Sequence, residues 1–117
     1  MDNTVEEKSF HFTVRIVKVY RYFEESKKEF TLSKQLLRCG TSIGANIAEA
    51  QQAQSRPDFI SKLSIALKEA YETDYWLRLL HATKYLSDPE FASLIGDCRE
   101  IEKMLTSIIK TTKETAP

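Results

Sequence analysis

The chain has 117 residues, of which 42% are hydrophobic and 29% charged, and it contains three glycines and three prolines. This composition is typical of one soluble, mostly helical domain, and it excludes a disordered chain or two separate cores. Seventeen basic residues balance seventeen acidic ones, so the net charge provides no whole-chain attraction for nucleic acid or an anionic membrane.

The first predicted helix covers residues 6–27. Asn3 or Thr4 is its expected N-cap, and Glu6 and Glu7 are favourably placed near the positive end of the helix dipole. Two adjacent lines of apolar side chains give this helix a wide apolar band. The lines are Phe10, Val14 and Val17, and Phe12, Ile16, Val19 and Phe23.

The second predicted helix, residues 32–54, has the highest density of small residues in the chain. Thr31 or Ser33 offers its N-cap. Gly40 and Gly44 lie inside it, and each costs up to about 1 kcal/mol relative to alanine in a helix interior. Tertiary packing must outweigh this cost, so we expect another helix to lie unusually close. The apolar face consists of Leu36, Leu37, Ile43 and Ile47.

A polar row also runs along the second helix. Arg38, Ser42, Asn46 and Glu49 follow one another at spacings of four, four and three, which stacks them on one stripe. Such a row can bind a phosphate or a partner carboxylate, but a solvated or internally paired helix face is the favoured interpretation. Glu72 of the third helix is a plausible partner for Arg38, and a pair buried in the bundle would favour one packing register.

The third predicted helix covers residues 57–86. Ser55 is its expected cap, with Pro57 and Asp58 in the first turn. Its apolar seam keeps the spacing of a coiled coil, and Asp74 occupies the polar position in that seam. The two apolar stripes are Ile60, Leu63, Leu67, Ala70 and Leu77, and Phe59, Ala66, Thr73 and Leu80.

Three aromatic side chains of the third helix predict an interface. Tyr71, Tyr75 and Trp76 add aromatic surface, and outside the core of the protomer such surface marks contact with another protein chain. We therefore expect an oligomer that uses these three residues.

The fourth predicted helix covers residues 89–113, after the turn signal at Ser87, Asp88 and Pro89. No strand pattern appears, and every connection is a few residues long, which makes successive helices antiparallel neighbours. The expected fold is all-α, an up-down-up-down antiparallel four-helix bundle that forms a single domain over residues 1–117.

Catalytic and metal-binding patterns do not emerge from the sequence. His11 and His81 are interpreted as helix-face residues, and the Glu-x-x-His pairs of a di-iron bundle are missing. Gly40 and Gly44 follow no strand, so they do not form a phosphate loop. We expect no catalytic, cofactor-binding or metal-binding residues, no cofactor, no small-molecule substrate and no enzymatic activity.

The two cysteines and the lack of an apolar span predict a cytoplasmic protein. Cys39 and Cys98 lie far apart and have no metal or redox spacing, so we expect reduced thiols in the core. No basic leader precedes an apolar run, and no stretch approaches the roughly 18 apolar residues of a membrane span. Association with a membrane is not expected.

Three short motifs relate this chain to a known family. They are Gln-x-x-Arg at Gln35 and Arg38, Ser-Ile-x-x-Asn-Ile-Ala-Glu at 42–49, and Asp-Phe at Asp58 and Phe59. With these motifs the chain closely resembles, over residues 8–113, the bacterial four-helix bundle proteins encoded within intervening sequences of 23S ribosomal RNA genes. The resemblance implies a homopentameric ring and no demonstrated enzymatic activity. A related member serves as an accessory protein to the reverse transcriptase of diversity-generating retroelements, where a basic surface binds nucleic acid.

Two functional hypotheses follow. The first is a non-enzymatic oligomeric scaffold or interaction module, whose interface uses the aromatics of the third helix and the small-residue helix. The alternative is a nucleic-acid-binding accessory protein associated with ribosomal RNA or a retroelement reverse transcriptase. Its expected contacts are Lys34, Arg38, Arg56 and Lys62, near the junction of the second and third helices.

Overall fold

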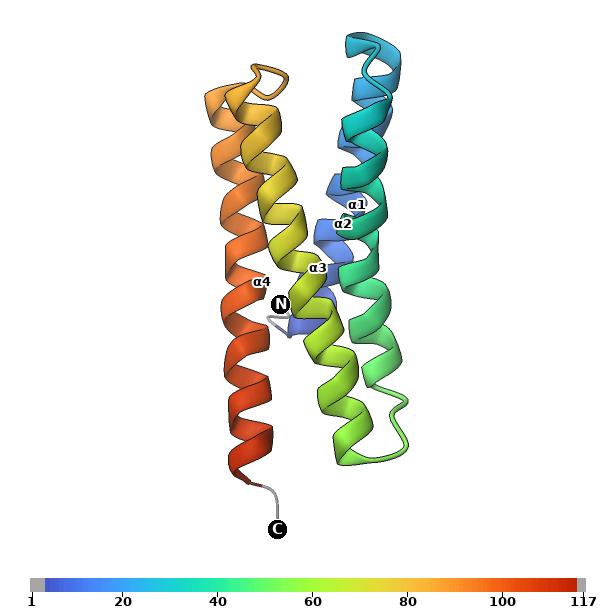
Figure 1. Cartoon of the computed structure of the whole chain (residues 1–117), viewed down its shortest axis with the longest axis vertical. Helices are drawn as coiled ribbons and strands as arrows, with labels where there is room; N and C mark the ends of the chain where they lie inside the picture. Colours follow the sequence, from blue (N-terminus) through green and yellow to red (C-terminus); the bar gives the residue numbers. More distant parts are fainter. Residues whose placement is uncertain (1–3, 116–117) are drawn as a thin grey trace.

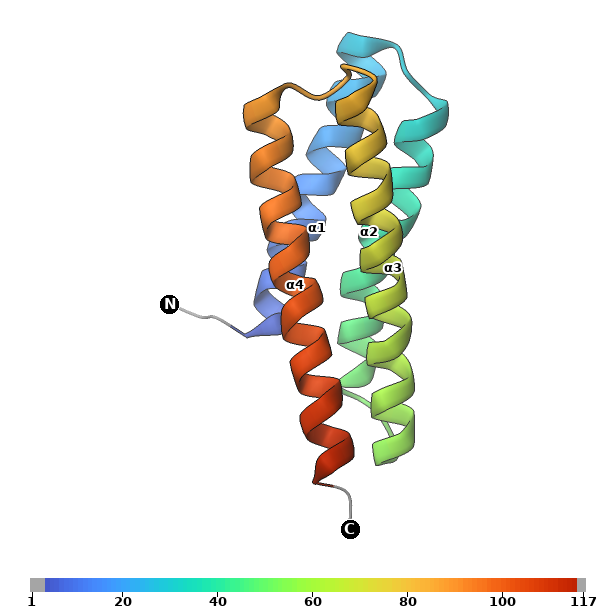
Figure 2. The same cartoon turned by 60° about the vertical axis from the view of Figure 1, so that its left-hand side comes forward.

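Helices joined by short loops make up residues 4–115, the part of the chain that this computed structural model describes. The elements are α1, Val5–Tyr22, continued by a π-helical turn η1, Phe23–Lys27, then α2, Thr31–Ala50, α3, Arg56–Ala82, and α4, Asp88–Glu114. Each helix lies antiparallel beside the next, and α1 also lies beside α4, which closes the ring of neighbours (Figures 1 and 2). The predicted all-α, up-down-up-down four-helix bundle is confirmed.

Hydroxyl side chains cap three of the four helices, as the sequence predicts. Thr4 caps α1, Ser55 caps α3 and Ser87 caps α4, and in each case the hydroxyl accepts a hydrogen bond from the backbone N–H three residues on. Ser87 and Glu90 form a reciprocal capping box. Asn3, the other cap considered for the first helix, lies outside the described residues.

The start of α2 differs from the prediction, because a glutamate caps it in place of Thr31 or Ser33. The carboxylate of Glu29 accepts hydrogen bonds from the backbone N–H groups of Thr31 at 3.1 Å, Leu32 at 2.9 Å and Ser33 at 2.8 Å. Burial opposes ionisation of this carboxyl, but the amide donors outweigh it and hold the pKa of Glu29 below its usual range. The negative charge also suits the positive end of the α2 dipole.

The ends of three helices carry features that periodicity does not predict. The first helix closes in the π-helical turn, after which Lys28 adopts a left-handed φ of 54°. α2 ends at Ala50, before the predicted boundary, because the following N–H groups bond three residues back in tight turns. α3 ends at Ala82, also early, because Lys84 has a left-handed φ of 70° and the next N–H groups turn back to the carbonyl of Leu80.

Gly40 and Gly44 mark the close approach of α1 to α2. A methyl group added to Gly40 would lie 2.9 Å from Cγ2 of the buried Ile16, and one added to Gly44 would lie 2.7 Å from Oγ1 of Thr13. The tight packing predicted from the small residues is confirmed. The larger residues of the core come from all four helices. The bulkiest fully buried side chains include Phe12, Phe23, Leu36, Ile43, Ile47, Leu63, Leu77, Leu80, Ile101 and Leu105.

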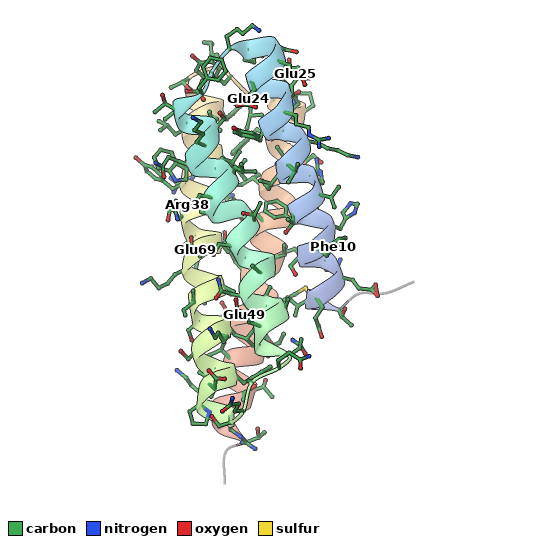
Figure 3. The ribbon with its side chains drawn as sticks, turned by 90° about the vertical axis from the view of Figure 1, so that its right-hand side faces the viewer. Phe10, Glu24, Glu25, Arg38, Glu49 and Glu69 are labelled. Atoms are coloured by element: carbon green, nitrogen blue, oxygen red, sulfur yellow. The ribbon has the colours of Figure 1, made fainter. Side chains whose placement is uncertain are left out.

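The apolar band of α1 is divided between the core and the surface. Phe12 and Ile16 are buried, but Phe10 is 71% exposed and Val14 is also exposed. Figure 3 shows Phe10 on the outer side of α1. The band is wider than the angle that the neighbouring helices cover, so one of its two lines remains at the surface.

The seam between α1 and α4 is the least extensive of the four helix–helix seams. Two ion pairs cross it, from Lys8 to Glu100 at 3.2 Å and from Arg15 to Asp97 at 2.6 Å. Toward the η1 end of the bundle, the two helices diverge (Figure 1). No helix within residues 4–115 is long and apolar enough to cross a membrane.

Candidate functional site

The arginine at the start of the predicted polar row forms the expected contact with the third helix, but at the surface. Arg38 bonds to the carboxylate of Glu72, and its guanidinium also lies 3.6 Å from Glu69, too far for a hydrogen bond. Glu72 additionally accepts a hydrogen bond from the indole N–H of Trp76 at 2.9 Å. Because 53% of the Arg38 side chain is exposed, the pair is not the buried register device that the sequence predicts.

The remaining members of the row have separate partners. The Asn46 amide donates to the carbonyl of Ser42 at 2.9 Å and to its hydroxyl at 3.0 Å, within α2. Glu49 pairs with Lys62 of α3 at 2.9 Å. Figure 3 shows Arg38 and Glu69 at one level of the α2–α3 seam and Glu49 further along it. The polar row is therefore an internally paired helix face, which is the interpretation that the sequence favours.

The four residues expected to contact nucleic acid do not form one patch. Lys34 lies near the start of α2 and Arg56 at the start of α3, and at 1.5 Å per residue about 24 Å of helix separates Lys34 from the α2–α3 junction. Arg38 and Lys62 are already paired with carboxylates. A nucleic-acid phosphate would therefore have to compete with these acids for two of the four cations.

The predicted interface aromatics are divided by exposure. Tyr71 is 53% and Tyr75 is 50% exposed, one turn apart on α3. The Arg78 guanidinium lies 5.7 Å from the centre of the Tyr75 ring. Trp76 is half-buried, packs against the core and meets Tyr75 edge-on. Tyr71 and Tyr75 are thus available to a partner, whereas Trp76 mainly serves the fold.

A second apolar surface lies between α1 and α2. The sequence predicted that the small-residue helix takes part in an interface, but not that Phe10 of α1 lies beside it. A groove of about 320 Å³ runs beside the exposed Phe10 and is lined by small residues of α2 that include Gly44, Ala45 and Ala48. The signal in the sequence was present, since Phe10 was assigned to the apolar band, but periodicity could not show that this line lies outside the core.

A cluster of charged side chains around a buried carboxylate belongs to the α3–α4 seam. Asp74 is 7% exposed and accepts hydrogen bonds from Arg78 at 2.9 Å and from Arg99 of α4 at 3.0 Å. Glu102 lies on the other side of Asp74, and the Cys98 thiol lies 3.6 Å from its carboxylate. The sequence identified Asp74 as the polar position of a seam, but not its partners on α4.

The pKa values of the two carboxyl groups of this cluster shift in opposite directions. Burial opposes ionisation of Asp74, but hydrogen bonds from Arg99, Glu102 and Arg78 outweigh it and lower the pKa of Asp74. Burial and the hydrogen bond to Asp74 raise the pKa of Glu102 to about 7. Below about pH 7, Glu102 therefore holds a proton, which it donates to the ionised Asp74.

The same three side chains have the spacing of a metal site but not its electrostatics. Ligand atoms of Asp74, Cys98 and Glu102 lie within 4.8 Å of one another. Arg78 and Arg99 already neutralise Asp74, and burial raises the pKa of the Cys98 thiol, so a cation would have to displace two guanidinium groups and ionise a buried thiol. Cys39 and Cys98 are free and buried, as predicted.

The described residues form an all-α four-helix bundle with ion pairs along its seams, a buried charged cluster and two exposed apolar surfaces. The chain belongs to the family of 23S rRNA-intervening sequence proteins, whose family model matches residues 1–107. The resemblance drawn from the sequence motifs is confirmed.

Comparison with solved structures supports the same assignment. The chain is similar to a protein of unknown function from the S23 ribosomal protein family of Bacteroides thetaiotaomicron, whose crystal structure has a resolution of 1.70 Å. The two are 58% identical, the match covers 92% of this chain and 99% of that chain, and the TM-score is 0.91. No curated protein matches the chain.

Proposed function

We propose that this protein is a non-enzymatic scaffold or interaction module that works as a homo-oligomer, with a pentameric ring as the assembly. The observation that carries the proposal is the pair of exposed apolar surfaces on different sides of one small bundle. We call Tyr71 and Tyr75 the tyrosine surface, and Phe10 with Ala45 and Ala48 the phenylalanine groove. Exposed apolar surface of this kind is typical of protein–protein contacts.

The positions of the two surfaces favour a ring. The tyrosine surface belongs to α3, and the phenylalanine groove belongs to the α1–α2 seam on the other side of the ring of helices. A contact between two unlike surfaces is heterologous, so each copy passes its other surface to the next, and the assembly closes into a ring when the rotation allows. A ring with an odd number of copies requires such a contact.

The experiment that tests the proposal measures mass by sedimentation equilibrium at micromolar concentration. We expect the unaltered protein to sediment as a pentamer. Phe10→Glu and the double variant Tyr71→Glu/Tyr75→Glu should each sediment as monomers, because each buries charge in the proposed contact. An equimolar mixture of the two should form 1:1 heterodimers, since one intact surface remains on each partner.

The control is Phe30→Glu, which introduces the same charge at an aromatic residue that is 48% exposed but belongs to neither surface. It should keep the mass of the unaltered protein. An unaltered protein that sediments as a monomer would contradict the proposal, as would a mixture of the two variants that stays monomeric.

The alternative function, a nucleic-acid-binding accessory protein, is motivated by the family resemblance. It predicts that structured RNA increases the mass of the assembly at low salt and not at high salt, because phosphate contacts release counterions. Substitution of Lys34 and Arg56, which have no ion-pair partner among residues 4–115, should then abolish the increase. If RNA leaves the mass unchanged at low salt, the scaffold proposal stands alone.

A further inference from the structure

A cavity occupies the place where α1 and α4 diverge. It has a volume of about 440 Å³, and the α1 part of its lining runs from His11 past Arg15 to Tyr22. Sites for small molecules have volumes of about 300–1,000 Å³. The cavity is therefore large enough to hold most of a small ligand, and the two surfaces proposed for assembly lie elsewhere.

The floor of this cavity is apolar. Phe23, Leu86 and Leu94 form it, and these side chains are 0%, 3% and 2% exposed. Val19 and Tyr22 of α1 complete one wall. The Tyr22 and Phe23 rings meet edge-on with centres 6.0 Å apart. The apolar surface open to a ligand therefore comes mainly from Val19 and from Tyr22, which is 42% exposed, while the three buried floor residues close the hollow from below.

The rim of the cavity carries an uncommitted positive charge. Lys18 is exposed and has no ion-pair partner among residues 4–115, and His11 lies about two turns before it on the same face of α1. Arg15 is bound to Asp97 and Ser93. On the opposite rim, Glu90 is engaged in the capping box at the start of α4.

The carboxylate of Glu90 accepts a hydrogen bond from the backbone N–H of Ser87 at 2.9 Å. The backbone and hydroxyl of Ser87 hold the pKa of Glu90 below its usual range, so the group is ionised but turned toward the start of α4. Of the charged groups at the rim, Lys18 is the one free to meet a ligand.

We infer that this cavity binds an amphipathic anion, a small molecule with an apolar tail and a carboxylate or similar head group. The tail lies against Val19 and Tyr22, above the buried floor of Phe23, Leu86 and Leu94, and the head group meets the ammonium of Lys18 at the rim. The inference goes beyond the scaffold role and does not depend on it, because the cavity is complete within one chain.

Calorimetric titration of the full-length protein with decanoate tests this inference. Decyltrimethylammonium, which has the same alkyl chain with a positive head, is the matched ligand. We expect decanoate to bind once per chain and about tenfold more tightly than the cation. Each methylene removed from the tail should weaken binding by up to about fourfold.

Charge reversal at the rim provides the variant test. Lys18→Glu should weaken decanoate binding about tenfold and improve binding of decyltrimethylammonium. Lys68→Glu changes the net charge equally on the exposed face of α3 and should leave both affinities unchanged. Equal loss in the two variants would overturn the inference, because it would show a response to net charge alone.

Filling the cavity separates a specific site from general surface binding. Val19→Phe should abolish decanoate binding while circular dichroism shows an unchanged helix content. Decanoate should also shift the methyl resonances of Leu86 and Leu94 in the unaltered protein, a readout that needs no variant. Methyl shifts confined to other parts of the bundle, or equal affinity for the two head groups, would overturn the inference.

Discussion

The arginine–carboxylate pairs of the α3–α4 and α2–α3 seams differ in how well the carboxylate and its arginines are shielded from water. Asp74, in the α3–α4 seam, is buried between Arg78 and Arg99. Arg38, in the α2–α3 seam, pairs with Glu72 while 53% of its side chain is exposed. The chemical groups are alike, but water screens the exposed pair, whereas loss of the buried acid would leave charges without a partner.

The difference indicates which contacts determine how the helices pair. We interpret Asp74 as the residue that fixes the register of α3 against α4, because a shifted register would bury it without its arginines. Apolar packing holds α2 against α3, and the Arg38 pair adds little to it. The following changes test this distinction.

The change with the largest expected effect is Asp74→Ala. It leaves Arg78 and Arg99 facing each other without an acid and deprives Glu102 of its acceptor. Because both guanidinium groups reach solvent, we expect the free energy of unfolding to fall by about 2–4 kcal/mol, somewhat less than for a fully buried pair. Urea unfolding in neutral buffer measures this value. A loss as small as that of an exposed pair would remove the distinction between the seams.

Gly40→Ala tests the α1–α2 seam, where packing acts without charge. The added methyl group would lie 2.9 Å from a side-chain carbon of the fully buried Ile16. We expect a loss of about 1–3 kcal/mol despite the better helix propensity of alanine. Gly96 of α4 has no atom within 4 Å of the same added methyl group, so Gly96→Ala is the matched control and should stabilise the protein by up to about 1 kcal/mol. Equal effects at both glycines would show that the contact between α1 and α2 is loose.

Glu102→Gln tests the titration of the buried cluster. The pKa of Glu102 is raised from 4.5 to about 7 by folding, so its contribution to stability is present below pH 4.5 and is lost as the pH rises through 7. Glutamine keeps an N–H donor for Asp74 without becoming charged. Allowing for solvent screening, we expect the free energy of unfolding of Glu102→Gln to rise relative to that of the unaltered protein. The relative gain between acidic and alkaline buffer should be on the order of 1 kcal/mol.

Urea unfolding across this pH range measures the difference between the two proteins. Glu114→Gln, at an exposed acid of α4 that has no ion-pair partner among residues 4–115, is the control and should show no comparable trend. A constant difference between Glu102→Gln and the unaltered protein would mean that folding does not shift the pKa of Glu102.

Arg38→Ala is expected to have the smallest effect. The free energy of unfolding should fall by less than about 1 kcal/mol, because the pair with Glu72 is exposed to water. The loss should shrink further at high salt, which screens such pairs. A loss as large as that of Asp74→Ala would show that exposure does not separate the two seams.

Local and periodic features of the fold could be predicted from the sequence. Apolar spacings marked the helices, and Ser55 and Ser87 marked two starts, because a cap acts within three residues of its own position. Gly40 revealed a close neighbour because its cost requires compensation. None of these inferences requires knowledge of how the helices are arranged in space.

Features that join distant segments could not be predicted in the same way. Glu72 was correctly paired with Arg38, but whether the pair lay inside or outside depends on the rotation of both helices. Arg99 and Glu102 meet Asp74 only because α4 takes one register. The cavity at Lys18 arises from divergence of two helices, which leaves no mark on apolar spacing.

The sparse seam between α1 and α4 has a dynamic consequence. A helix held mainly along one side can detach as a unit at a lower free energy than global unfolding requires. We expect native-state hydrogen exchange to show α1 amides exchanging through such an opening, before those of the α3–α4 hairpin. The opening would rotate α1 about its close contact with α2 and expose the whole floor formed by Phe23, Leu86 and Leu94. The opening of this one helix would then control ligand entry.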